Sequence, residues 1–189
     1  MQFRSMIIAN QEVSPGYFRM RVTAPPELAG AKPGQFVMVR VRDAIDPLLR
    51  RPFGIFDVGT VPSEYPGCSP ATYLEMLYKV VGKGTEALAT YHHGDHLDLL
   101  APLGFGFDLG DPDEEKILVG GGIGIAPLYY LAKTLVARSR VRFIARFRAL
   151  GSSGCVGSVA LIFQVQFLVL PGECAGRSPP PGLPPGRGR

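Results

Sequence analysis

KILVGGGIGIAPL, residues Lys116–Leu128, is the stretch that decides the expected fold. Three apolar residues after Lys116 predict a short buried strand, and four glycines follow: Gly120, Gly121, Gly122 and Gly124. Pro127 suits the first turn of a helix, and apolar residues then recur at helical spacing through Ala137. A strand, a glycine loop and a helix in this order let backbone N–H groups approach a phosphate. The spacing is not the G-x-G-x-x-G fingerprint, so a plain tight turn between strand and helix remains the alternative.

The flanking segments extend this unit and add a second one. Val141–Ala145 predicts another strand, which completes a strand–helix–strand unit. Five upstream segments predict antiparallel strands: Phe3–Ala9, Tyr17–Thr23, Gln35–Arg42, Tyr73–Val81 and His96–Leu100. Proline and glycine separate the first three of these strands, which is typical of a β-sandwich or a small barrel. The acidic segment Asp108–Glu115 is expected to be a solvated connection between the two units.

We therefore expect a β-barrel plus α/β fold. Residues 1–104 form an antiparallel barrel, and residues 112–150 form a truncated Rossmann-like domain. Residues 151–189 contain eight glycines and six prolines among 39 residues, above the share of about 25–30% that indicates disorder. This tail is predicted to be atypical and largely disordered, with Ser158–Leu170 as its one potential strand. A reading-frame shift after about residue 146 would explain its lack of lysine.

Charge and cysteine content exclude several classes of function. The net charge of +4 comes from the last quarter, because residues 1–137 hold 12 basic and 15 acidic side chains. A nucleic-acid interface is not expected, since that quarter has no reader motif. Neither a signal peptide nor a membrane span is predicted, and the setting is expected to be cytoplasmic. The cysteines lack metal-ligand spacing and an even-numbered disulfide framework; they are Cys68, Cys155 and Cys174.

Taken together, five motifs resemble the ferredoxin reductase-like flavoproteins. Within that family they are most similar to electron transfer subunits of NAD-dependent dihydroorotate dehydrogenase. The motifs are PGQFVMV (Pro33–Val39), RRPFGI (Arg50–Ile55), LYKVVGKGTEAL (Leu77–Leu88), GDHLDLLAPLGFGF (Gly94–Phe107) and ILVGGGIGIAPL (Ile117–Leu128). Their order and separations fit the family from residue 1 to about residue 145.

The resemblance implies FAD on the barrel and NAD on the α/β domain. It puts Arg51 on the flavin pyrophosphate, a role that a planar guanidinium suits, and Phe53 on the isoalloxazine. The implied cofactor-binding residues are Arg51, Pro52, Phe53, Gly54, Leu77, Tyr78, Lys79, Gly84, Thr85, Gly121, Gly122 and Gly124. Simpler alternatives remain: solvated arginines, core aromatic residues at 53 and 78, and Thr85 as a cap for the helical run Glu86–Ala89.

The implied function is electron transfer in pyrimidine biosynthesis, from a dihydroorotate dehydrogenase catalytic subunit through FAD to NAD. The flavin carries the chemistry, so no catalytic side chain is predicted. The alternatives are a reductase subunit of another oxidoreductase, such as a hydrogenase, and a non-catalytic flavin-binding fragment.

The sequence departs from the family in its possible metal ligands. The family's [2Fe-2S] cluster needs four thiolates, and this chain has three cysteines. We expect His92, His93 and His96 to be loop histidines rather than metal ligands, because no carboxylate lies at fixed helical spacing from them. Position 54 is glycine where many relatives carry a serine.

Overall fold

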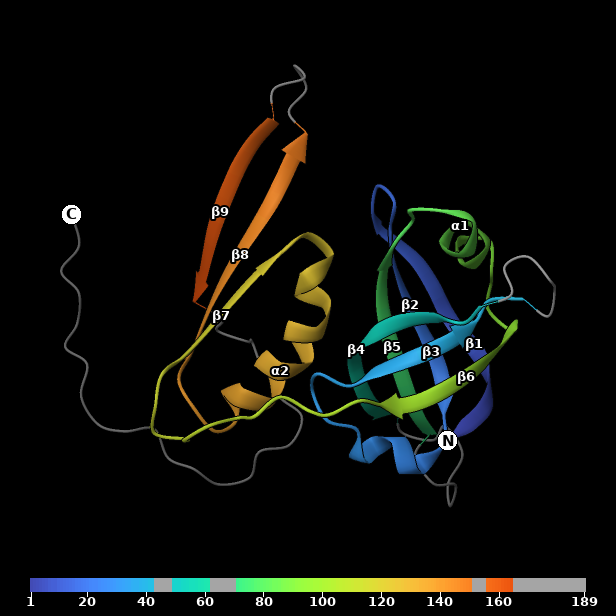
Figure 1. Ribbon diagram of the computed structural model, residues 1–189, viewed down its shortest axis with the longest axis horizontal. Coiled ribbons are helices and arrows are strands. Elements are labelled where there is room, and N and C mark those ends of the chain that lie inside the picture. The colour runs from blue at the N-terminus through green and yellow to red at the C-terminus, as the bar shows by residue number, and fades with distance from the viewer. Residues whose placement is uncertain (43–48, 62–70, 151–155, 165–189) are drawn as a thin grey trace.

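The computed structural model describes residues 1–42, 49–61, 71–150 and 156–164. Its first part is a closed antiparallel barrel with the strand order β1-β2-β5-β4-β3-β6 (Figure 1). The strands are β1 (Gln2–Ser14), β2 (Tyr17–Ala24), β3 (Phe36–Arg40), β4 (Arg51–Val61), β5 (Ala71–Lys79) and β6 (His96–Leu103). The short helices η1 (Pro26–Gly30) and α1 (Lys83–Ala89) lie between strands in the chain.

Alternating side chains explain why these segments close into a barrel. On β2, Met20 and Val22 are fully buried, and they lie opposite Met76 and Leu74 of β5. Successive side chains of a strand point to opposite faces, so one face of each strand fills the barrel and the other faces outward. The predicted antiparallel barrel is thereby confirmed.

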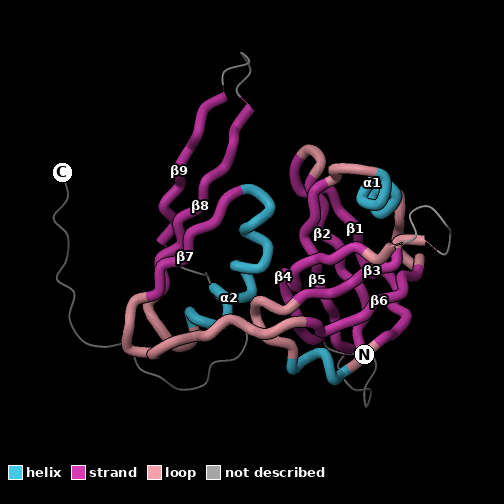
Figure 2. Tube along the Cα trace, in the orientation of Figure 1, coloured by secondary structure: helices cyan, strands magenta, loops and turns pink. Residues whose placement is uncertain are grey.

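The second part is a small sheet with one helix. Strand β7 (Lys116–Gly121) runs parallel to β8 (Val141–Leu150), and β8 pairs antiparallel with β9 (Val156–Gln164). The turn η2 (Gly122–Ile125) leads into α2 (Ala126–Val136), so the helix begins and ends close to its predicted limits. In Figures 1 and 2, α2 lies between this sheet and the barrel.

Strand β9 overlaps Ser158–Leu170, the one potential strand of the tail, and begins two residues before it. Its residues fall in the segment expected to be largely disordered, yet they pair with β8 from Arg142–Gln164 to Leu150–Val156. The composition of residues 151–189 as a whole predicted disorder, whereas the apolar run within them predicted this strand. Residues 165–189 lie outside the described residues, and the expectation for them stays a prediction.

Helix α2 covers only one face of the small sheet. Leu118 and Phe143 pack against Leu131 and Leu135 of the helix. The alternate residues of β7 point away from α2, so Ile117 and Val119 are 56% and 69% exposed. One face of this unit is therefore a packed core, and the β7 side chains of the other face are open to solvent.

Candidate functional site

The first cluster of predicted site residues lies where β4 begins beside α1. Arg51 is the first residue of β4. Its guanidinium nitrogen Nη1 donates a hydrogen bond to the carbonyl oxygen of Leu49 at 2.8 Å. A Cβ added to the buried Gly84 would lie 3.1 Å from Nε of Arg51. The guanidinium thus passes directly over the first turn of α1, and glycine at position 84 leaves room for it.

Thr85 shapes the chain reversal into that turn. Its hydroxyl accepts hydrogen bonds from the backbone N–H groups of Val81 and Gly82, at 2.9 and 3.2 Å, and donates to the Gly82 carbonyl at 3.0 Å. Sequence reasoning expected Thr85 to precede a helix at Glu86. The helix instead begins at Lys83, so Thr85 lies within its first turn and organises the loop before it.

The predicted flavin-side aromatic residues meet at the same end of β4 and β5. The Phe53 and Tyr78 ring centroids are 5.7 Å apart, and Phe18 stacks on Tyr78 at 5.6 Å. Tyr78 is only 2% exposed, and its hydroxyl donates to Oδ1 of Asn10 at 3.0 Å. Burial raises the pKa of Tyr78 to about 12. Tyr78 is therefore buried in the barrel core, where it contacts the half-buried Phe53.

Alternation along β5 separates the other two predicted residues from Tyr78. Leu77 and Lys79 lie on the opposite face of the strand, where Leu77 is half-buried and Lys79 is exposed. The Lys79 ammonium lies 5.4 Å from the ring centroid of Tyr17. The structure thus places Arg51 next to Gly84, with Phe53 two residues after Arg51 on β4, and it turns Leu77 and Lys79 to another surface than Tyr78.

The glycine loop reaches β4 through the start of α2. A Cβ on Gly54 would lie 3.5 Å from Cβ of Pro127, which is ordinary van der Waals contact. Gly121, Gly122 and Gly124 are exposed, and Gly122 has φ +54°, a conformation that glycine adopts readily. The predicted nicotinamide-side loop therefore lies beside the predicted flavin strand, although the two are more than 60 residues apart in the chain.

Three further contacts fix α2 to the barrel. The rings of Phe56 and Tyr129 stack at 4.3 Å with an interplanar angle of 11°. Lys133 Nζ donates to both carboxylate oxygens of Asp57 at 2.9 Å. The Tyr130 hydroxyl donates to the Ala31 carbonyl at 2.8 Å. Stacking, an ion pair and a hydrogen bond thus hold the loop-bearing helix against β4.

Sequence reasoning missed the pair of Asp57 and Lys133. The available signal was a lone carboxylate in the apolar segment Ile55–Val58, since a buried charge needs a partner. The side chain of Asp57 is 7% exposed and that of Lys133 is 45% exposed. Burial lowers the pKa of Lys133, but the hydrogen bond and the charge of Asp57 outweigh it, so the net pKa is raised. The ammonium therefore stays charged in this interface.

The three histidines lie at the barrel surface. His92, His93 and His96 are exposed, and one ring nitrogen of His93, Nδ1, lies 3.0 Å from the Ile8 carbonyl oxygen. Within the described ranges, no three histidine, cysteine, aspartate or glutamate side chains are grouped closely enough to hold a metal ion. All three cysteines lie outside those ranges. In the same part of the chain, no helix has the length and apolar character needed to cross a bilayer.

Curated relatives support the resemblance seen in the motifs, although no family model matches the chain. The electron transfer subunit of dihydroorotate dehydrogenase B (NAD(+)) from Bacillus cereus strain B4264 is 39% identical over 152 residues. The match covers 78% of this chain and 55% of that relative. The same subunit from Bacillus anthracis strain CDC 684 is 38% identical over 152 residues. The chain thus spans about half the length of the curated relatives it matches.

Solved structures agree with the fold. The structure of an NADH-dependent reduced ferredoxin-NADP oxidoreductase superposes with a TM-score of 0.63 at 28% identity, over 77% of this chain and 49% of that one. Phthalate dioxygenase reductase superposes with a TM-score of 0.61 at 20% identity, over 82% of this chain and 46% of that one. The ferredoxin reductase-like fold and the predicted resemblance are confirmed.

Proposed function

We propose that this chain, a homologue of the dihydroorotate dehydrogenase B electron transfer subunits with a ferredoxin reductase-like fold, binds FAD on its barrel and exchanges electrons with NAD. The observation that carries the proposal is the position of Arg51 against Gly84 in the first turn of α1, with Phe53 two residues after Arg51 on β4. A cation over the first turn of a helix, with an aromatic ring beside it, matches the two ends of a flavin nucleotide.

The residues present fit FAD in their chemistry, and glycine at position 84 leaves room beside Arg51. Arg51 would hold the pyrophosphate, since its planar fork pairs with two phosphate oxygens. Thr85 keeps the loop before α1 in the conformation that admits those phosphates, and Phe53 would pack against the isoalloxazine ring. When bound, FAD supplies the redox chemistry, while the protein binds and orients it. The loop of Gly121–Gly124 would approach the nicotinamide.

The wider role is part of the same proposal. The electrons would come from a dihydroorotate-oxidising catalytic subunit and leave on NAD, in the cytoplasm. The [2Fe-2S] cluster does not fit this sequence, because its three cysteines are one thiolate short. A reductase subunit of another oxidoreductase would use the same barrel motifs, so co-purification with one catalytic subunit or the other separates the two roles. A non-catalytic flavin-binding fragment would bind FAD and stay oxidised in the presence of NADH.

We predict that the 189-residue chain, loaded with FAD, is reduced by dithionite but only slowly by NADH. Hydride transfer needs the nicotinamide held about 3–3.5 Å from the flavin, and a loosely held site loses much of that advantage. The exposed glycine loop and the open face of β7 indicate a loosely held nicotinamide. The measurement is anaerobic stopped-flow absorbance of the bound flavin, with free FAD as the control. Bleaching within a second at sub-millimolar NADH would contradict this prediction and show a competent nucleotide site.

A further inference from the structure

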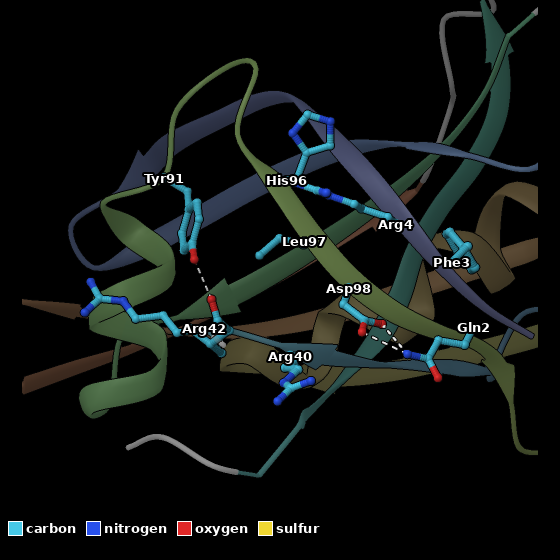
Figure 3. A pocket seen from close by; sticks show the side chains of 10 residues that line it. Gln2, Phe3, Arg4, Arg40, Arg42, Tyr91, His96, Leu97 and Asp98 are labelled. Carbon is cyan, nitrogen blue, oxygen red and sulfur yellow. Dashed lines mark hydrogen bonds between the residues drawn. The ribbon is translucent and has the colours of Figure 1, made fainter. Parts of the chain in front are cut away.

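A pocket on the outer face of the barrel lies apart from the proposed flavin site. Its volume is about 630 Å³, and it lies over β1, β6 and the end of β3 (Figure 3). Strand register places Arg4 and Arg40 on either side of Asp98, which both of them face across neighbouring strands. Figure 3 shows Arg4 and His96 on one side of the pocket and Arg40 and Arg42 on the other.

Among the described residues that line the pocket, the one carboxylate is that of Asp98, and it is already paired. The carboxylate oxygen Oδ1 of Asp98 accepts a hydrogen bond from the Arg50 guanidinium at 3.0 Å. The same guanidinium donates a second hydrogen bond to the backbone carbonyl oxygen of Asp98 at 2.9 Å. Gln2 donates to both carboxylate oxygens at 2.8 and 3.1 Å. Asp98 therefore has little capacity left to compensate the other arginines.

The remaining cations give the pocket a positive field. Arg4 and Arg42 are exposed and form no hydrogen bond or ion pair within the part of the chain that the structure describes. Arg40 has an interaction of its own, so the positive field is assigned to Arg4 and Arg42 alone. In residues 1–137 acidic side chains outnumber basic ones, 15 to 12, so a concentration of arginines here is not a property of the whole surface. Such a cationic hollow raises the local concentration of anions.

Strand alternation separates this pocket from the flavin site. Arg51 lies opposite Val39, which is buried in the barrel. Arg40 follows Val39 in the chain, and Arg50 precedes Arg51. Because successive side chains of an extended chain alternate between the two faces, Arg40 and Arg50 point to the outer face. The side chain of Arg51 therefore lies on one face of the β3–β4 hairpin, and the pocket lies on the opposite face.

We propose that this pocket binds a small phosphate-bearing anion through Arg4 and Arg42. Guanidinium groups pair with phosphate oxygens in a planar fork, which makes arginine the usual residue for this task. The volume lies within the range of about 300–1,000 Å³ that is typical of small-molecule sites. The aromatic side chains of Phe3 and Tyr91 line the same pocket and would contact an organic part of the ligand. Inorganic phosphate and a phosphate monoester share this chemistry.

Calorimetric titration of the full chain in phosphate-free buffer tests the proposal. The probes are inorganic phosphate and ribose 5-phosphate, with neutral ribose as the control ligand. We expect both anions to bind and Arg4→Gln/Arg42→Gln to weaken them at least tenfold. Arg19→Gln, a change of an exposed arginine on β2, should leave the affinity unchanged. Tighter binding of ribose 5-phosphate than of phosphate would identify a monoester as the preferred form, and equal binding would identify the free ion.

The same titration in an Arg51→Ala chain separates this pocket from the flavin site. Phosphate binding that persists without Arg51 and disappears without Arg4 and Arg42 supports the pocket, whether or not the chain binds FAD. Binding that disappears only with Arg51→Ala belongs to the flavin site and overturns the proposal. Absence of binding to the unmodified chain, or equal binding by the double variant, overturns it as well.

Discussion

FAD affinity is expected to fall about 10- to 150-fold when Arg51 is replaced by alanine. A hydrogen bond to a charged group contributes about 1.5–3 kcal/mol, and each 1.4 kcal/mol is a tenfold change in affinity. The adjacent Arg50 cannot replace Arg51, because Arg50 is bound to Asp98 on the other face of the hairpin. The measurement is a fluorescence titration of FAD with the purified protein.

Arg50→Ala is the matched control for that titration. It removes the same side chain one residue away, and FAD affinity should stay within about twofold, since Arg50 contacts Asp98 and not α1. Equal losses in the two variants would indicate a general effect of lowered positive charge. Unchanged affinity in Arg51→Ala would remove Arg51 from the site.

Lys133→Met is expected to lower the free energy of unfolding by about 2–3 kcal/mol. Breaking a fully buried ion pair costs about 3–5 kcal/mol, mostly because one charge is left without its partner. The cost here is smaller because Lys133 is half exposed, and Asp57 keeps hydrogen bonds from the Val58 N–H at 2.9 Å and the Tyr73 hydroxyl at 3.4 Å. Urea unfolding followed by circular dichroism measures the change.

Arg142→Met provides the control for this second variant. Arg142 pairs with Glu115 at 3.0 Å, but both side chains are well exposed, so its loss should cost less than about 1 kcal/mol. Hydrogen exchange should also speed up in α2 of the Lys133 variant and stay unchanged in β2 and β5. Identical stability of the Lys133→Met chain and the parent chain would show that the ion pair does not hold α2 to the barrel.

Local patterns predicted the secondary structure because they act over short distances in the chain. The alternation of Gln35–Arg42 gave β3, and the glycine loop with Pro127 gave the β7–α2 connection. The apolar run Ser158–Leu170 predicted a strand that overlaps β9, but its antiparallel pairing with β8 was not predicted, because that pairing depends on register rather than on composition. The start of α1 was predicted too late in the chain. The Thr85 hydroxyl bonds backward to the loop, and a threonine can do so either before a helix or inside its first turn.

The candidate site was predictable only in part. The family motifs predicted Arg51, Phe53 and Gly84 as cofactor-binding residues; the structure places Arg51 next to Gly84 and has Phe53 two residues after Arg51 on β4. Asp57 and Lys133 are 76 residues apart, so nothing local in the sequence pairs them. Their contact depends on how α2 packs on β4, and a sequence pattern does not specify that packing.

The central claim is that the barrel holds FAD by its pyrophosphate at Arg51 and the first turn of α1. A parallel titration of the chain with FAD and with riboflavin, which lacks phosphate, tests it most directly. We predict one FAD per chain, with a shifted visible spectrum of the flavin and at least tenfold weaker binding of riboflavin. Failure to bind FAD, or equal affinities for FAD and riboflavin, would contradict the account.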